Sequence, residues 1–288
     1  MKLLITGGTG LLGSEFVRLA GHRGWGGVAP TRAEMDITDV DRCARVFTAE
    51  SPDWVIHCAA FTSVDQAEVQ PDEAMRVNRA GSASVARAAQ GAGAGMVHIS
   101  TDYVFDGLKR VPYLPDDPTS PIGAYARSKV AAEEAVRACG STTAQLIVRT
   151  GWLYGAGRRD FIDMVLDRTV AGEPLRIVDD QWGRPTWARN VAGTVLDLIE
   201  RGASGIVNVN DAGQTTWHGF ALAVVEEAGL TGQLDRVSSS EYGAPAERPL
   251  YSVLDLRATE VELGREMMPW RKALRTYLNE RSRRESSE

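Results

Sequence analysis

The sequence contains little cysteine and little lysine, and it has no long apolar run. Its three cysteines, Cys43, Cys58 and Cys139, are too few for a disulfide framework and too scattered for a metal site. We therefore expect no metal and a reducing, cytoplasmic environment. The apolar start of "MKLLITGGTG" meets glycine too soon for a signal peptide. No segment approaches the roughly 20 apolar residues that a membrane helix needs, so we expect no membrane partner.

Acidic residues outnumber basic ones, with 38 Asp and Glu against 32 Lys and Arg. The formal net charge of the 288 residues is -6 at pH 7, which argues against a protein that binds the phosphate backbone of nucleic acid. An anionic ligand would therefore need a local binding arrangement. Lysine occurs only at Lys2, Lys109, Lys129 and Lys272, so a lysine at a candidate site is an uncommon event in this chain.

Short apolar runs alternate with amphipathic segments in the first half of the chain. Buried strands are predicted for "KLLIT", "GGVAP", "DWVIHCAA", "GMVHIS" and "QLIVRT", and helices for segments such as "LLGSEFVRLA" and "DVDRCARVFTAE". Continuous apolar strands joined by helices predict an α/β fold with a Rossmann-type, doubly wound parallel sheet over residues 1–150. Ligands of such a sheet bind at the carboxyl ends of its strands.

The regularity weakens after residue 150. Loops rich in Gly and Pro alternate with predicted helices at Asn190 to Glu200 and His218 to Ala228. We expect residues 151–288 to form mainly a smaller, substrate-binding lobe, with some segments returning to the main domain. The charged terminal run "NERSRRESSE" is expected to be frayed.

A glycine-rich turn follows the first predicted strand in "LLITGGTGLLG". Gly7 permits a sharp turn, Gly10 lets the backbone approach a pyrophosphate, and Gly13 allows the next helix to pack closely on the strand. The free N–H groups at the start of that helix suit an anion. The pattern therefore favours dinucleotide binding, with a purely structural turn as the alternative.

The end of the second predicted strand carries no carboxylate for a ribose hydroxyl. Arg32 stands there instead, and its guanidinium suits a 2'-phosphate, so we favour NADPH with NADH as the alternative. Asp36, with Ile37 beside it, either caps a helix or flanks the adenine. Ala59 and Ala60, after the third strand, leave room for a cofactor or serve tight helix packing.

Polar side chains end the fourth predicted strand, where "HISTD" supplies Thr101 and Asp102. A later helix carries Tyr125 and Lys129, whose spacing of four residues places both on one face. Reduction of a ketone by hydride needs a proton donor, and a neighbouring ammonium lowers the phenol pKa of about 10 towards neutrality. We therefore predict Tyr125 as proton donor, Lys129 as its partner and Thr101 as a hydrogen-bond donor to the carbonyl oxygen. Tyr125 and Lys129 are also predicted to bind the cofactor, with Lys129 at the nicotinamide ribose.

Motifs along most of the chain resemble the extended short-chain dehydrogenase/reductases, and within them the dTDP-4-dehydrorhamnose reductases. The resemblance rests on the motifs "TGGTGLLG", "CAAFTSVDQAE", "HISTDYVFDG", "YARSK", "RTGWLYG", "DDQWGRPT", "TTWHGFA" and "RPLYSVLD". It implies reduction of the C4 ketone of a dTDP-4-dehydro-6-deoxyhexose by NAD(P)H, with the catalytic residues Thr101, Tyr125 and Lys129.

The resemblance also implies a set of binding residues. Those implied for the cofactor are Gly10, Leu11 and Leu12 at the pyrophosphate, Asp36 and Ile37 at the adenosine end, and Ala59, Ala60 and Thr62 between them. Those implied for the sugar are Thr101, Asp102 and Trp152. Arg248 is a further candidate for the nucleotide diphosphate, since a guanidinium suits it, and a plain surface arginine is the alternative.

Two residues depart from the family pattern on the predicted substrate side. Gly151 stands where serine is usual, and Tyr251 stands where asparagine is common. These departures leave open a 4-ketoreductase for another dTDP-deoxysugar. A nucleotide-sugar 4,6-dehydratase is disfavoured because Tyr103 follows Asp102 where a second acid is needed. A non-catalytic, NADP-binding regulatory subunit and a homodimer also remain open.

Overall fold

The computed structural model describes residues 1–140 and 143–285 of the chain. Its centre is a parallel sheet of six strands in the order β10-β5-β4-β3-β1-β2. The strands are β1 (Lys2–Thr6), β2 (Gly26–Val28), β3 (Trp54–His57), β4 (Gly95–Ile99), β5 (Gln145–Arg149) and β10 (Gly205–Asn208). The chain turns from β1 to β2 in one direction and then crosses to β3 in the other. The switch point of the sheet therefore lies between β1 and β3, where ligands of such folds bind.

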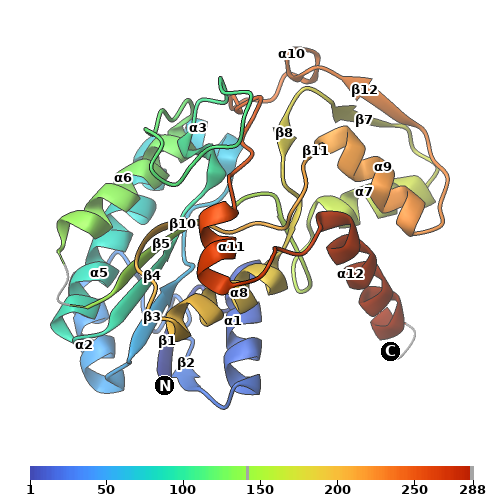
Figure 1. Cartoon of the computed structure of the whole chain (residues 1–288). Coiled ribbons are helices and arrows are strands. Elements are labelled where there is room, and N and C mark those ends of the chain that lie inside the picture. The colour runs from blue at the N-terminus through green and yellow to red at the C-terminus, as the bar shows by residue number, and fades with distance from the viewer. Residues whose placement is uncertain (141–142, 286–288) are drawn as a thin grey trace.

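Helices cover both faces of this sheet (Figure 1). One face carries α1 (Leu11–His22), α8 (Ala188–Glu200) and α11 (Arg257–Leu263); the other carries α2 (Val40–Glu50), α5 (Ser82–Gly91) and α6 (Ala124–Ala138). Successive side chains of a strand point to opposite faces. In β1, Leu3 and Ile5 pack in the core under α1 and α8, whereas Leu4 packs in the core under α2 and α5.

The second half of the chain supplies short strand pairs and three further long helices beside the sheet (Figure 1). The pairs are β6 (Leu153–Tyr154) with β9 (Thr186–Trp187), β7 (Leu175–Val178) with β12 (Leu234–Val237), and β8 (Trp182–Gly183) with β11 (Thr215–Thr216); the helices are α7 (Phe161–Val170), α9 (Trp217–Glu227) and α12 (Trp270–Glu285). The predicted helices at 190–200 and 218–228 are confirmed as α8 and α9. The division of the chain at residue 150 stays a prediction.

Smaller helical segments connect the elements of the main sheet and the second half. They are α3 (Val64–Val69), α4 (Pro71–Met75), the π-helix η1 (Arg76–Gly81), the 3-10 helix η2 (Asp102–Val104) and α10 (Ser239–Tyr242). The five predicted strands in the first half are confirmed as strands, but β2 was wrongly predicted to be buried, since it is largely exposed at the edge of the sheet. Strand β10 is a sixth strand that was not predicted.

The expectation of a frayed charged tail is wrong for its described part. Helix α12 continues to Glu285. Tyr277 is buried against Tyr154 of β6 and Trp187 of β9, Leu278 is buried in the same cluster, and Arg281 pairs with Asp163 of α7. The last three residues of the tail lie outside the described part. Among residues 1–140 and 143–285, none of the helices combines the length and the apolar character that crossing a bilayer requires.

Candidate active site

The glycine-rich turn lies at the switch point of the sheet. Gly7 has a φ of 66°, and the Gly10 N–H donates to the Gly7 carbonyl at 2.9 Å, which closes the turn. A Cβ atom on Gly7 would lie 2.8 Å from the Ala59 nitrogen, and one on Gly13 would lie 2.9 Å from the Gly8 Cα. Only glycine fits at these two positions, because the turn packs against the loop after β3 at Gly7 and helix α1 packs against the turn at Gly13.

Helix α1 starts at this turn with Gly10 as its N-cap, and no side chain caps it. Its first N–H groups, including those of Leu11 and Leu12, are therefore available to an anion. The loop after β3, which contains Ala59, Ala60 and Thr62, lies opposite, since the Ala59 N–H donates to Thr6 Oγ1 at 3.2 Å. These residues fit the pyrophosphate and the middle of a dinucleotide.

Asn78, in η1, fixes that loop. Its Oδ1 accepts from the Phe61 N–H at 2.8 Å, and its Nδ2 donates to the Phe61 carbonyl at 3.0 Å and to Ser128 Oγ at 2.8 Å. Asn78 is 1% exposed, so these bonds are shielded from water. The Asn78 side chain therefore ties the loop after β3 to helix α6. No local sequence pattern indicates this role, because Asn78 and Ser128 are 50 residues apart in the chain.

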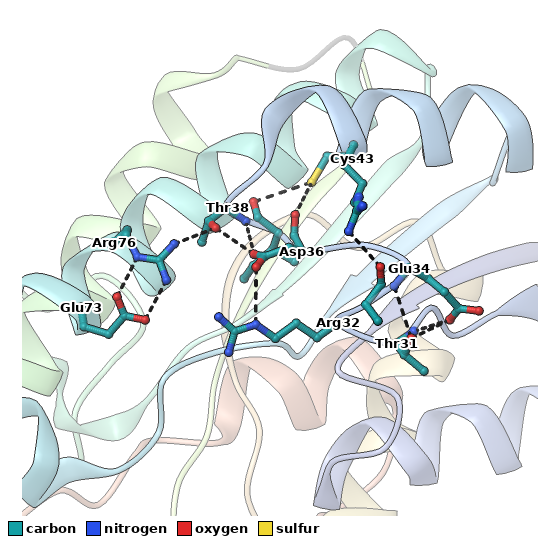
Figure 2. Close-up of polar contacts among 11 residues, drawn as sticks. Thr31, Arg32, Glu34, Asp36, Thr38, Cys43, Glu73 and Arg76 are labelled. Atoms are coloured by element: carbon teal, nitrogen blue, oxygen red, sulfur yellow. Dashed lines mark hydrogen bonds and ion pairs between the residues drawn. The ribbon is translucent and has the colours of Figure 1, made fainter.

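Figure 2 shows the polar contacts of Asp36, which is expected at the adenosine end. Asp36 accepts from the Thr38 N–H at 2.9 Å and from the Thr38 hydroxyl at 2.8 Å, and the first of these bonds contributes most to lowering its pKa. The N-cap of α2 is Asp39, which accepts from the Arg42 N–H at 2.9 Å. The helix-capping alternative for Asp36 is therefore wrong. Its neighbour Ile37 is buried.

Two arginines approach this Asp36–Thr38 turn from two sides (Figure 2). Arg32 donates to Asp36 over 3.4 Å and its side chain is 75% exposed, so its guanidinium is held only weakly. Arg76 donates to Thr38 Oγ1 at 2.7 Å and binds Glu73 through two nitrogens. Arg76 was not identified from the sequence, because this contact joins segments that are 38 residues apart.

Thr101 and Asp102 lie directly beyond β4, as the sequence predicted. Thr101 caps η2, since the Tyr103 N–H donates to its Oγ1 at 3.2 Å. Its hydroxyl donates to Asp102 Oδ1 at 3.2 Å. Both residues are buried, at 5% and 3% exposure, and burial raises the pKa of Asp102 to about 7. The carboxyl end of β4 therefore carries a hydroxyl and an acid of nearly neutral pKa.

Helix α6 brings Tyr125 and Lys129 to the same place. The Glu68 carboxylate accepts from the Ala124 N–H at 2.6 Å at the start of the helix, where a negative charge is favourable. Tyr125 follows in the first turn and shares a hydrogen bond with Thr101, which lowers its pKa. One turn later, Lys129 Nζ donates to the Ile99 carbonyl at 2.6 Å, at the last residue of β4.

The predicted effect of Lys129 on Tyr125 is wrong for this structure. Burial outweighs the other influences and raises the pKa of Tyr125 to about 12. Burial also lowers the pKa of Lys129 to about 8, although the Glu133 carboxylate opposes that shift. Tyr125 is therefore protonated at neutral pH, and Lys129 is still largely charged.

A buried ion pair lies behind Lys129. Glu133 binds Arg149 through both of its oxygens, at 3.0 and 2.8 Å, and the two side chains are 4% and 3% exposed. The Ser100 hydroxyl donates to the same carboxylate at 2.5 Å. This pair fixes α6 against the ends of β4 and β5, and it was not identified from the sequence.

Trp152 follows β5 in an unusual backbone conformation, with a φ of 53°. Its ring stacks on Trp217 with centroids 3.7 Å apart, and the side chain is 8% exposed. Its Nε1 is buried without a hydrogen-bond partner in the described part of the chain. A strained residue with an unpaired buried donor is typical of a ligand site.

Arg248 is less free than the sequence suggested. Its guanidinium donates to Asp65 at 2.9 Å and to the Ala246 carbonyl at 2.8 Å. It also forms a hydrogen bond with the Tyr103 phenol, which packs edge-on against Tyr125 at 6.4 Å. Arg248 therefore lies beside the reactive cluster, with several of its donors already engaged.

Known proteins are similar to this chain over nearly its whole length. The family model for the RmlD substrate binding domain matches residues 1–283. The spore coat polysaccharide biosynthesis protein SpsK of Bacillus subtilis (strain 168) is 41% identical over 281 residues, which cover 98% of each chain. The dTDP-4-dehydrorhamnose reductase of Burkholderia thailandensis is 39% identical over 292 residues, which cover 95% of this chain and 97% of that protein.

A solved structure agrees with these matches. The dTDP-4-dehydrorhamnose reductase of Bacillus anthracis strain Ames, in complex with NADP, has a TM-score of 0.93 and 32% identity, covering 97% of this chain and 99% of the other. The resemblance drawn from the motifs, and the fold that it implied, are confirmed. The chain belongs to the dTDP-4-dehydrorhamnose reductase family of extended short-chain dehydrogenase/reductases.

Proposed function

We propose that this chain uses NADPH to reduce the C4 ketone of a dTDP-4-dehydro-6-deoxyhexose, with dTDP-4-dehydro-L-rhamnose as the leading substrate. The observation that carries the proposal is the meeting of Thr101 and Tyr125 at the end of β4, in a sheet whose first turn fits a dinucleotide. The Burkholderia relative is named for this reduction, and the Bacillus anthracis structure holds NADP.

Tyr125 gives the proton. Its phenol is protonated at neutral pH because burial raises its pKa, so the donor is ready before the substrate arrives. The Thr101 hydroxyl, which is hydrogen-bonded to that phenol and donates to Asp102 in the absence of substrate, turns its single hydrogen to the carbonyl oxygen as negative charge develops there. Lys129 lies one helical turn from Tyr125 and donates one hydrogen to the Ile99 carbonyl, which leaves two N–H groups of its ammonium for the nicotinamide ribose.

NADPH supplies a hydride when it is bound. The remaining cofactor residues hold and orient it. Gly10, Leu11 and Leu12 bind the pyrophosphate. Ala59, Ala60 and Thr62 contact the middle of the cofactor, and Asp36 and Ile37 contact its adenosine end. The Arg32 guanidinium, which is bound only weakly by Asp36, binds the 2'-phosphate of NADPH, and this contact favours NADPH over NADH.

The sugar lies against Thr101, Asp102 and Trp152. The unpaired indole N–H of Trp152 donates to a sugar oxygen, which relieves the cost of burying that donor without a partner. Arg248 is a weaker candidate for the diphosphate, because Asp65 and the Ala246 carbonyl already hold it.

A second candidate function is the reduction of another dTDP-deoxysugar at C4. Gly151 and Tyr251, the two departures from the family pattern, support it, because Gly151 adjoins Asp102 and Tyr251 adjoins Ser252. The hypothesis of a non-catalytic regulatory subunit is disfavoured, because the chain has Thr101, Tyr125 and Lys129 together at the end of β4. A homodimer stays a prediction.

Product analysis tests the proposal. Purified protein is incubated with NADPH and dTDP-4-dehydro-6-deoxyhexoses, and the product is examined by mass spectrometry and NMR coupling constants. We expect NADPH consumption and a new C4 alcohol, whose configuration separates dTDP-L-rhamnose from other deoxysugars. NADPH binding without reduction of any dTDP-linked ketosugar would favour the regulatory alternative.

A further inference from the structure

The carboxyl group of Asp102 occupies a closely defined position beside the reactive phenol. Its N–H donates to the Thr150 carbonyl at 3.1 Å, which continues the pairing of β4 with β5 beyond the ends of both strands. This pairing places Asp102 against Gly151. The negative charge of Asp102 raises the pKa of Tyr125, so the Asp102 carboxyl and the Tyr125 phenol lie close to each other.

Gly151 provides the space for this carboxyl group. A Cβ atom at Gly151 would lie 2.6 Å from Asp102 Oδ2, and closer still to its Cγ and Oδ1. The φ of Gly151 is not positive, so glycine here leaves space for the Asp102 carboxyl group, which the serine usual in the family would force to move. Asn210 Nδ2 donates to the Gly151 carbonyl at 3.1 Å, and this bond opposes a retreat of the backbone.

Ser252 provides the hydrogen bond that fixes the carboxyl group. Its Oγ donates to Asp102 Oδ2 at 2.5 Å, and the residue is 3% exposed. Its own N–H donates to the Trp182 carbonyl at 2.8 Å, so the hydroxyl sits on a segment that is itself fixed. Thr101 donates to the other oxygen, Oδ1. The Thr101 hydrogen leaves Oδ1 when it turns to the substrate carbonyl, so with substrate bound Oδ1 has both acceptor sites free and Oδ2 has one.

We propose that Gly151 and Ser252 are positioning residues, which hold the Asp102 carboxyl so that its free acceptor sites bind a sugar hydroxyl next to the reacting ketone. This inference rests on the proposed function. The ligand group is a hydroxyl of a hexose, because a hydroxyl can donate to the ionised carboxylate and can also accept from its protonated form, which a pKa of about 7 populates. The two residues act through Asp102 and touch no reacting atom, so they determine sugar affinity rather than the proton transfer itself.

Steady-state kinetics of the full chain test this inference, using Ser252→Ala, Ser252→Thr and Gly151→Ser. We expect Ser252→Ala and Gly151→Ser to lower kcat/KM for the ketosugar about tenfold or more, with the change mainly in KM. Ser252→Thr, which keeps the hydroxyl, restores most of the loss. Affinity for NADPH stays unchanged in all three variants. Ser239→Ala is the matched control, because it removes a serine–aspartate bond of similar length, to Asp180, within the second half.

A double-mutant cycle identifies Asp102 as the intermediary. In an Asp102→Asn background, adding Ser252→Ala should cost less than about twofold, since the positioned group is already lost. Wild-type KM in both Ser252→Ala and Gly151→Ser, or full additivity with Asp102→Asn, would overturn the inference. Parallel losses of ketosugar and NADPH binding would also overturn it. If Gly151→Ser does not fold, Ser252→Ala and the cycle decide. A wild-type protein that reduces no dTDP-ketosugar refutes the proposed function instead.

Discussion

Replacing Lys129 by methionine should stabilise the protein at neutral pH while it removes catalysis. Lys129 is 3% exposed, and its Nζ donates to the Ile99 carbonyl. Burial is the main cause that lowers its pKa from 10.5 to about 8. The folded chain therefore binds this proton less tightly than the unfolded chain does, so the charged form of Lys129 opposes folding.

The size of the effect follows from the two pKa values. Each pKa unit corresponds to about 1.4 kcal/mol, so the ammonium destabilises the folded state by roughly 3 kcal/mol below pH 8. The cost disappears as the pH rises from 8 to about 10.5, because the folded chain releases the proton first. Losing the bond to the Ile99 carbonyl offsets about 1 kcal/mol, which leaves a net gain of about 2 kcal/mol for methionine at pH 7.

Thermal unfolding without added nucleotide measures this gain. We expect the Tm of Lys129→Met to exceed that of wild type by about 4 °C at pH 7, and the difference to shrink strongly by about pH 9.5. Lys272→Met, at an exposed position on α12, is the control and should leave Tm unchanged at both pH values. A lower Tm for Lys129→Met at pH 7, or a gain that does not depend on pH, would refute the reasoning.

Three further predictions follow from contacts around the site. Glu133→Ala should destabilise the protein by about 3–5 kcal/mol in urea unfolding, because it leaves the buried Arg149 guanidinium without its carboxylate; a loss under about 1 kcal/mol would contradict the pair. Arg32→Ala should raise the KM for NADPH about tenfold and leave the KM for NADH unchanged, whereas equal effects on both would argue against a 2'-phosphate contact. Gly13→Ala should abolish NADPH binding in calorimetric titration, because its Cβ would collide with the Gly7 carbonyl; normal binding by a folded variant would disprove the close packing.

Local patterns were enough to predict the core of the fold. Each central strand of the first half is a continuous apolar run, and such runs are recognisable because parallel strands are buried on both faces. The glycine-rich turn was predictable for the same local reason, since the conformation of Gly7 and the packing of Gly13 involve neighbours close in sequence or the next strand. The prediction that Tyr125 and Lys129 lie on one face of a helix needed only their spacing of four residues and helical geometry.

Long-range contacts account for what the sequence analysis missed. The hydrogen bond between Ser252 and Asp102 joins residues 150 positions apart, and the bond between Asn78 and Ser128 joins residues 50 positions apart. No local sequence pattern predicts either bond. The pKa of Tyr125 was predicted in the wrong direction because burial is a property of the assembled fold, whereas the four-residue spacing shows only the neighbouring ammonium. Asp36 and Asp39 are equally good capping residues by type, and only the path of the chain into α2 selects Asp39.

The most direct test of the central claim compares wild type with Tyr125→Phe, each given NADPH and a dTDP-4-dehydro-6-deoxyhexose. The absorbance of NADPH reports turnover, and fluorescence titration reports its binding. We predict that wild type consumes NADPH, and that Tyr125→Phe loses at least about 100-fold in kcat while it binds NADPH with unchanged affinity. Turnover by Tyr125→Phe at the wild-type rate would contradict the assignment of Tyr125 as proton donor.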